Sequence, residues 1–177
     1  MMGYYKDPEK TAEVMTNDYF HTGDIGEIDD QGFLKITDRK KEMFKTSGGK
    51  YISPQVIENI MKQSLFIEQI MVVGDGRKMP TALIQPNIDY IIQWLLSQNI
   101  KVNSLEDACK EKILVETIQK EIENYNQKFG SWEQVKKFEL VPEEWSIDAG
   151  HLTPTMKLKR KVVKEKYIAL IEKMYSS

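Results

Sequence analysis

Residues 70–84 read IMVVGDGRKMPTALI. Two short apolar runs, Ile70–Val73 and Ala82–Ile84, flank a segment that begins with Gly74 and also contains Gly76. Short apolar runs on either side of a glycine-containing turn are typical of a β-hairpin. Because neither run contains a polar residue, we expect this hairpin to be deeply buried.

A second, less apolar hairpin is indicated nearer the start of the chain. Residues 25–28 and 33–36 alternate apolar and polar side chains, and the turn-forming segment Asp29–Gly32 lies between them. This alternation is typical of a hairpin with one apolar face. Because two strands alone are only marginally stable in water, we expect this hairpin to need a surface to pack on.

Helices and one further strand complete the predicted fold. Apolar side chains recur at helical spacing after Ser53-Pro54, from Ile88 to Leu96, from Ser104 to about Phe129 and from Lys159 to Met174, and residues 8–15 form a polar stretch of helical pattern. Residues 138–141 form a short strand that ends before Pro142. We therefore expect an α+β fold in which helices pack on a small mixed sheet.

Composition limits the classes of protein that fit the chain. Its 177 residues, 41% of them hydrophobic and 29% charged, are enough for a globular domain with its own core. A net charge of −2 gives no general attraction to nucleic acid, and we expect no nucleic-acid partner. The single cysteine, Cys109, excludes an internal disulfide and favours a reducing, cytoplasmic location. Two histidines and one cysteine show no metal-ligand spacing, so we expect no metal site.

Three polar clusters are candidates for function. In the first, Thr22-Gly23-Asp24, the Asp24 carboxylate could accept hydrogen bonds from a diol such as a ribose, although a turn aspartate that bonds its own backbone is more common. In the second, residues 37–42, Arg39 offers a planar donor and the segment could act as a hinge, although a solvated corner is more common. Gly48-Gly49 follows soon after and is too short for a phosphate-binding loop.

The third cluster, residues 153–157, precedes the last predicted helix. Lys157 begins a basic run that continues to Lys166. Such a run is usually the solvated face of a helix, and a patch for anionic lipid or nucleic acid is an alternative. A more specific interpretation is a single lysine that a loop presents to a phosphate as a point charge.

The clusters together, in this order, resemble the C-terminal part of adenylate-forming enzymes, the superfamily of acyl-CoA synthetases, luciferases and peptide-synthetase adenylation domains. The stretches that carry the resemblance read YFHTGD at 19–24, TDRKK at 37–41 and TPTMK at 153–157. The stretch FKTSGGKYISP at 44–54 and the long helical insert at about 87–130 resemble most closely the long-chain fatty acid–CoA ligases. The resemblance covers nearly the whole chain.

The resemblance implies a division into two parts. Residues 1–40 would be the last piece of a large AMP-binding domain, with the first hairpin as its remnant, and residues 41–177 would be a mobile C-terminal lid. The phosphate loop, the Mg²⁺ site and the acyl tunnel of the family belong to an N-terminal domain, and no counterpart of that loop occurs here. We therefore expect a fragment that is inactive alone, with the missing domain as its partner.

The resemblance also implies roles for the lysines and glycines. ATP and CoA would be the co-substrates, and a long-chain fatty acid would be the acid that is activated. Lys157 matches the lysine that catalyses adenylation, although members usually have glycine where this chain has Met156. Lys45 matches a residue of the surface used in thioester formation, and the Gly48-Gly49 loop, whose two glycines cannot be assigned separately, would line the path of CoA.

The remaining matched positions are assigned to nucleotide binding and to movement. Asp24 matches the acidic residue that holds the ribose hydroxyls, and Arg39 matches the basic residue beside it. Lys41 matches the hinge about which the lid rotates between the two half-reactions.

Two other classes of function stay open at this point. The chain could be a stand-alone, non-catalytic module that binds CoA, a nucleotide or a protein partner. It could also use the basic run that begins at Lys157 to bind a surface, which leaves a peripheral contact at the inner face of the membrane as an alternative location.

Overall fold

The computed structural model describes residues 1–176, except for the side chain of Asp38. The chain divides into two compact units, Met1–Met43 (unit 1) and Phe44–Ser177 (unit 2), and each is described by itself.

Unit 1 consists of one short helix and two small antiparallel pairs of strands. Helix α1 begins where the Asp7 carboxylate accepts a hydrogen bond from the Lys10 N–H, as expected for a residue at a helix N-cap. The elements are α1 (Pro8–Val14), β1 (Met15–Thr16) paired with β2 (Tyr19–Phe20), and β3 (Asp24–Ile28) paired with β4 (Leu34–Arg39). The predicted N-terminal helix and hairpin are thereby confirmed.

The turn of the β3–β4 hairpin is held by the Asp29 side chain. One carboxylate oxygen accepts hydrogen bonds from the N–H groups of Gln31 and Phe33, both at 2.9 Å. The prediction that the second strand begins at Phe33 is wrong, because these bonds keep Phe33 in the turn and β4 begins at Leu34. The apolar side chains of Ile28, Phe33, Leu34 and Ile36 are 57–73% exposed.

A three-stranded mixed sheet forms the centre of unit 2. Strand β7 (Ile67–Val73) runs antiparallel to β8 (Thr81–Pro86), and β8 runs parallel to β9 (Lys137–Leu140). The deeply buried hairpin and the mixed sheet are thereby confirmed. Ile70 and Val72 contribute to one apolar cluster, whereas Met71 and Val73 contribute to another. Because both faces of the strand pair are covered, its sequence is continuously apolar rather than alternating.

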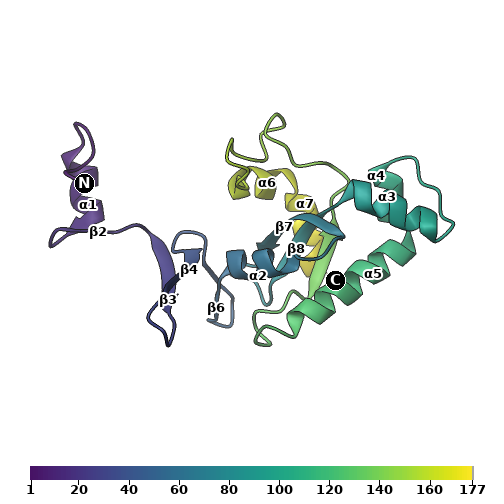
Figure 1. Cartoon of the computed structure of the whole chain (residues 1–177), viewed down its shortest axis with the longest axis horizontal. Helices are drawn as coiled ribbons and strands as arrows, with labels where there is room; N and C mark the ends of the chain where they lie inside the picture. Colours follow the sequence, from purple (N-terminus) through teal and green to yellow (C-terminus); the bar gives the residue numbers. More distant parts are fainter. Residues whose placement is uncertain (177) are drawn as a thin grey trace. The chain divides into compact units, whose positions relative to one another are not determined.

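Helices cover both faces of this sheet (Figure 1). The first cluster is completed by side chains of α2 (Pro54–Met61), α3 (Ile88–Ser97), α4 (Leu105–Lys110) and α5 (Lys112–Asn126). The second is completed by α6 (Arg160–Lys166) and α7 (Ile168–Ser176). The predicted α+β fold with helices packed on a mixed sheet is therefore confirmed.

Two helices that we expected to be continuous are each interrupted by one residue. Glu111 has an extended backbone, with ψ of 117°, between α4 and α5. Tyr167 has φ of −105° and ψ of 23° between α6 and α7, and its hydroxyl donates to the Glu143 carboxylate. The apolar spacing missed both breaks because buried positions continue on either side of them.

A tight hairpin opens unit 2 and shapes the glycine loop. Strands β5 (Phe44–Lys45) and β6 (Tyr51–Ile52) pair, and in the loop between them the Gly49 N–H donates to the Thr46 carbonyl at 2.9 Å. Gly49 has φ of +81°, a left-handed conformation that favours glycine. Gly48 has no such backbone requirement. The structure therefore separates the two glycines, which the sequence alone could not do.

The glycine loop is fixed to the turn that joins β7 and β8. The Ser47 N–H donates to the Arg77 carbonyl, and the Gly76 N–H donates to the Lys45 carbonyl, both at 2.8 Å. These two backbone bonds make the glycine loop and the β7–β8 turn one rigid corner of unit 2.

A second tight turn carries Lys157. The N–H of Met156 donates to the Thr153 carbonyl at 2.8 Å, and the N–H of Thr153 donates to the Lys157 carbonyl at 2.8 Å. An antiparallel bridge between Leu152 and Leu158 closes the base of the turn. Met156 has φ of +60°, so it adopts the backbone conformation that glycine would adopt at this position.

We expect the two glycines of the β5–β6 loop to respond differently to alanine. Gly49→Ala should lower the free energy of unfolding by about 1 kcal/mol, because a Cβ is strained in the left-handed region. Gly48→Ala should change it little, because the nearest atom to an added Cβ is the Thr46 Oγ1 at 3.9 Å. Chemical denaturation of both variants measures the difference, and an equal loss would contradict this account of the loop.

The turn before α6 gives a second prediction. Met156→Gly should raise the free energy of unfolding by up to about 1 kcal/mol by removing left-handed strain, whereas Met156→Val should lower it, because β-branched residues are least tolerated there. Thermal and chemical denaturation measure both changes. Destabilisation by glycine would show that the Met156 side chain, rather than its backbone, holds the turn.

Candidate functional site

Lys157 projects from the turn just before α6 as an exposed residue. Its backbone is fixed, because its N–H donates to the Thr153 Oγ1 at 3.0 Å. Among residues 1–176, no ion-pair partner contacts its amine. An exposed amine on an ordered turn is accessible to an anion from outside the unit, to which it would act as a point charge.

The rest of the basic run does not form a uniform positive surface. Arg160 pairs with Glu58, Lys161 with Glu165 and Lys166 with Glu143. These intramolecular pairs neutralise half of the six basic residues of the run. They therefore weaken the alternative that this helix binds anionic lipid or nucleic acid through its net charge.

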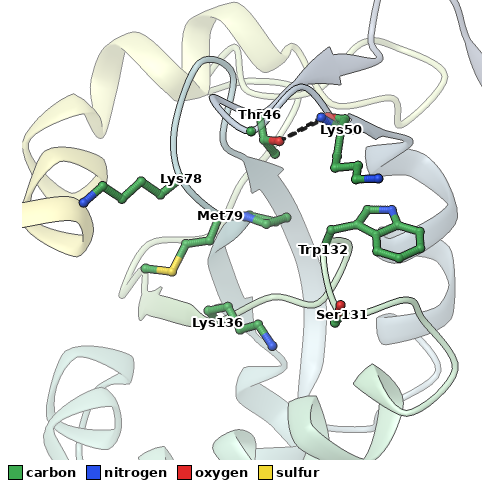
Figure 2. Close-up of a pocket in the computed structure, with 9 residues that line it drawn as sticks. Thr46, Lys50, Lys78, Met79, Ser131, Trp132 and Lys136 are labelled. Atoms are coloured by element: carbon green, nitrogen blue, oxygen red, sulfur yellow. Dashed lines mark hydrogen bonds between the residues drawn. The ribbon is translucent and has the colours of Figure 1, made fainter.

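A cavity of about 540 Å³ opens beside the glycine loop (Figure 2). Three separate segments line it: residues 46–50, 78–80 and 131–136. The lining residues are Thr46, Gly48, Lys50, Lys78, Met79, Pro80, Ser131, Trp132 and Lys136. Of the two glycines that the sequence singled out, only Gly48 lines this cavity, whereas Gly49 shapes the loop.

The cavity combines positive charge with an aromatic surface. The Lys50 amine lies 5.1 Å from the centre of the Trp132 ring, and Figure 2 shows the two side chains next to each other. Trp132 is 48% exposed. The Lys136 amine donates to the Gln134 Oε1 at 2.6 Å, whereas the Lys78 side chain extends away from Trp132 in Figure 2. A planar, anionic ligand such as a phosphorylated nucleotide matches this chemistry, because aromatic faces stack on bases and lysines attract phosphates.

Sequence reasoning did not assign a role to Lys50, Lys78, Trp132 or Lys136. The position of Lys50 directly after Gly48-Gly49 is a signal that could have suggested it. Nothing local connects Trp132 to the glycine loop, because the two are brought together only by the parallel pairing of β8 with β9.

Lys45 lies at the other side of the same hairpin. Its amine is 5.5 Å from the centre of the Tyr51 ring, and both residues are exposed. The β5–β6 hairpin thus presents Lys45 on one strand and the loop with Gly48 directly after it, so the structure does bring these two predicted residues together.

Unit 1 brings Asp24 and Arg39 together. They are opposite each other in the β3–β4 register, and the Arg39 Nε lies 3.2 Å from the Asp24 Oδ1. The Thr22 Oγ1 accepts a hydrogen bond from the Asp24 N–H at 3.1 Å. A hollow of about 950 Å³ within this unit is bordered by Asp24, Thr22 and Lys41, among others. An acidic and a basic side chain held side by side can bind a hydroxyl-bearing ligand from two directions.

Lys41 lies in the turn that ends unit 1. The Glu42 N–H donates to the Arg39 carbonyl at 2.9 Å in this turn, and the division between the two units follows at Met43. Lys41 is exposed. Asp24, Arg39 and Lys41 therefore belong to unit 1, whereas Lys45, the glycine loop and Lys157 belong to unit 2.

Neither the single thiol nor the metal-ligating side chains of residues 1–176 form a second site. Burial raises the pKa of the Cys109 thiol to about 11, which makes it a poor nucleophile at neutral pH. Within residues 1–176, His, Cys, Asp and Glu side chains nowhere gather in a group of three that could hold a metal ion. In the same part of the chain, every helix is too short or too polar to cross a membrane.

The sequence is similar to curated enzymes that are much longer than this chain. It is 38% identical to the long-chain-fatty-acid–CoA ligase FadD15 of Mycobacterium tuberculosis, over 98% of this chain and 29% of that protein. It is also 38% identical to the human long-chain-fatty-acid–CoA ligase 1, over 99% of this chain and 26% of that protein. The chain therefore spans less than a third of the length of these relatives.

Solved structures and a family model give the same assignment. The adenylation domain of a carboxylate reductase from Mycobacterium chelonae matches 99% of this chain and 26% of its own, with a TM-score of 0.80 and 26% identity. The corresponding domain from Segniliparus rugosus, solved with AMP and a carboxylic acid, matches 98% of this chain and 26% of its own, with a TM-score of 0.80 and 25% identity. The model of the AMP-binding enzyme C-terminal domain matches residues 42–177. The chain therefore belongs to the AMP-binding enzyme family and carries its C-terminal domain.

Proposed function

We propose that this chain is the C-terminal part of an ATP-dependent long-chain fatty acid–CoA ligase. The observation that carries the proposal is that unit 2 has two separate cationic surfaces: the exposed Lys157 on its turn, and the cavity between the glycine loop and Trp132. A ligase of this kind binds anionic substrates in two successive steps, first ATP with the fatty acid and then CoA, and the similarity to long-chain-fatty-acid–CoA ligases supports that class of reaction.

The first half-reaction is acyl-adenylate formation. The fatty acid carboxylate attacks the α-phosphorus of ATP, a P–O bond forms, and pyrophosphate leaves. Because two anions approach each other, the barrier falls when a cation is held where negative charge develops. Lys157 supplies that cation, while Asp24 and Arg39 bind the ribose hydroxyls. Mg²⁺ and the acyl chain are bound by a domain that precedes this chain.

The second half-reaction is thioester formation. The sulfur of CoA attacks the acyl carbon, the bond to AMP breaks, and AMP leaves with its electron pair. The nucleotide end of CoA occupies the cavity, with its base against Trp132 and its phosphates near Lys50 and Lys136. The pantetheine arm passes Gly48, where no side chain blocks it, toward Lys45.

The two surfaces lie at different ends of unit 2. In Figure 1 the loop before α6 lies at one end of the unit, and the segment between α5 and β9 lies at the other. One reaction centre cannot meet both surfaces in a single orientation, so the unit turns between the half-reactions, with Lys41 as the hinge. The exposed apolar face of the β3–β4 hairpin packs on the preceding domain.

A stand-alone CoA-binding module is a second candidate function. It is favoured by one observation, namely that all nine residues of the cavity belong to unit 2. The two candidates differ in catalysis: the module would bind CoA and never support adenylation, even when joined to a large domain. We place the protein in the cytoplasm under both candidate functions. For the ligase, a peripheral contact at the inner face of the membrane is the alternative location.

The CoA site can be tested on this chain by itself. CoA titration should quench Trp132 fluorescence, and Trp132→Ala should weaken CoA binding about tenfold in calorimetry, because stacking of a base on an aromatic ring is worth ~1–3 kcal/mol. Lys50→Ala should also weaken it, and pantetheine should bind more weakly than CoA. Lys112→Ala, which removes an exposed lysine of α5, is the matched control. Equal affinity of Trp132→Ala and the unmodified chain would refute this site.

The role of Lys157 is tested in the full-length ligase that contains this chain. Lys157→Ala should slow acyl-adenylate formation on the order of 10²–10³-fold, because a cation at the developing charge is lost. It should leave thioester formation from supplied acyl-AMP unchanged. Pyrophosphate exchange measures adenylation, and consumption of the CoA thiol with supplied acyl-AMP measures thioester formation. The chain by itself should show no exchange with ATP and palmitate, and turnover by the pure chain, or equal loss in both steps, would contradict the proposal.

A further inference from the structure

Arg160, three residues after Lys157, is partly buried and forms an ion pair with the buried Glu58. The Arg160 Nη1 donates to the Glu58 Oε1 at 2.7 Å and to the Oε2 at 2.9 Å. The Arg160 Nη2 donates to the Val72 carbonyl at 2.6 Å, and the Glu58 Oε1 accepts from the Val72 N–H at 2.7 Å. Glu58 is only 7% exposed. Four hydrogen bonds thus join α6, α2 and β7 at one point.

The pair covers the backbone of Val72 on one edge of the central sheet. Strand β7 is an edge strand, since the strand order is β7–β8–β9. The Val72 N–H and carbonyl, which are not used to pair with β8, both find partners in Glu58 and Arg160. Loss of either side chain would leave a buried charge and a buried backbone group without a partner, which is costly.

Packing alone holds α6 only weakly. This helix has seven residues and one buried side chain, Val163. A short helix with a single buried residue has little apolar contact to fix its orientation. Arg160 is its first residue, so the fork of hydrogen bonds to Glu58 and Val72 fixes the end of the helix from which the Lys157 turn emerges.

The two ends of the turn are also joined to each other. The Lys159 N–H donates to the carbonyl of His151 at 2.8 Å, and His151 is buried. The Lys166 amine lies 3.1 Å from the His151 Nε2 and 2.6 Å from Glu143. The base of the turn is therefore closed by a backbone bond and linked to α6 through Lys166, whereas Arg160 attaches it to α2 and β7.

We propose that Glu58 and Arg160 are positioning residues for Lys157: their ion pair, by binding both backbone groups of Val72, sets the place of the lysine amine in adenylation. This inference rests on the proposed function of Lys157. Neither residue touches the substrate, and both act only through the geometry of the turn. Small misplacements of a catalytic group cost a large part of the rate, up to about 100-fold for ~1 Å.

Kinetics of the full-length ligase test the proposal. Arg160→Lys keeps the charge but lacks the planar fork, and it should lower kcat for adenylation about 10- to 100-fold while changing KM for ATP less than about threefold. Thioester formation from supplied acyl-AMP should stay within about twofold of the unmodified enzyme. Arg160→Met, which keeps the volume without charge or donors, should lower kcat further. Lys112→Ala is the control for removal of an exposed positive charge.

Hydrogen exchange on the chain itself separates positioning from general stability. In Arg160→Lys, the hydrogen-bonded amides of Thr153, Met156 and Lys157 should exchange faster, whereas amides of β8 should keep their protection under conditions where the variant is fully folded. If Arg160→Met does not fold, the same measurement is made on Arg160→Lys and on Glu58→Gln. Glu58→Gln keeps an acceptor for the Val72 N–H. Uniform loss of protection throughout unit 2 would show a purely structural role and overturn the proposal.

The outcomes distinguish this inference from the proposed function. If Lys157→Ala abolishes adenylation and Arg160→Lys has full kcat, the positioning role is refuted while the ligase function stands. If Lys157→Ala is fully active, the proposed function fails, and with it the positioning role for catalysis. A fall in kcat for both half-reactions in Arg160→Lys would also overturn the inference.

Discussion

Strand β8 has all six of its residues buried, and its alternate side chains contribute to two separate apolar clusters. This burial on both faces requires helices on both sides of the sheet, which α2, α3 and α5 provide on one side and α6 and α7 on the other. The elements that carry the candidate site follow from that constraint. The glycine loop precedes α2, Trp132 lies between α5 and β9, and Lys157 precedes α6, so each site segment connects elements that the sheet holds in place.

The edge strand β7 needs partners for its backbone groups, just as the faces of the sheet need apolar cover. An edge strand presents backbone groups that can pair with another chain. At Val72 these groups are covered by Glu58 and Arg160. Burial raises the pKa of the Glu58 carboxyl, and the Arg160 guanidinium and the Val72 N–H act in the opposite direction. A buried pair of this kind adds little net stability compared with apolar residues. Its contribution is geometric, because only one arrangement satisfies all four hydrogen bonds.

Local patterns in the sequence predicted the elements but not their interruptions or their contacts. The runs around Gly74 predicted the buried hairpin, and the helical patterns that begin at residue 8 and after Ser104 are confirmed as α1 and α4. The breaks at Glu111 and Tyr167 left no signal, because the apolar spacing continues through them. The pairing of Asp24 with Arg39 depends on strand register, which a bulge between Ile25 and Gly26 shifts.

The candidate site shows the same division between local and distant information. Lys157, Lys45 and the Gly48-Gly49 pair were proposed from motifs, since each belongs to a short stretch of sequence that resembles the family. Trp132 and Lys136 were missed, because they meet the glycine loop only after β9 pairs with β8.

Met156 shows how a departure from a motif can preserve its geometry. Family members usually have glycine before the lysine, and here methionine takes the same left-handed backbone, with φ of +60°. That conformation costs ~1–2 kcal/mol. Contacts of the surrounding turn offset this cost: the hydrogen bonds that Thr153 makes with Met156 and Lys157, the Leu152–Leu158 bridge and the fixed start of α6. A strained residue persists only where its surroundings determine its conformation. The strain at Met156 and the Glu58–Arg160 pair are therefore independent signs that this turn is held in one conformation, as the catalytic role that we propose for Lys157 requires.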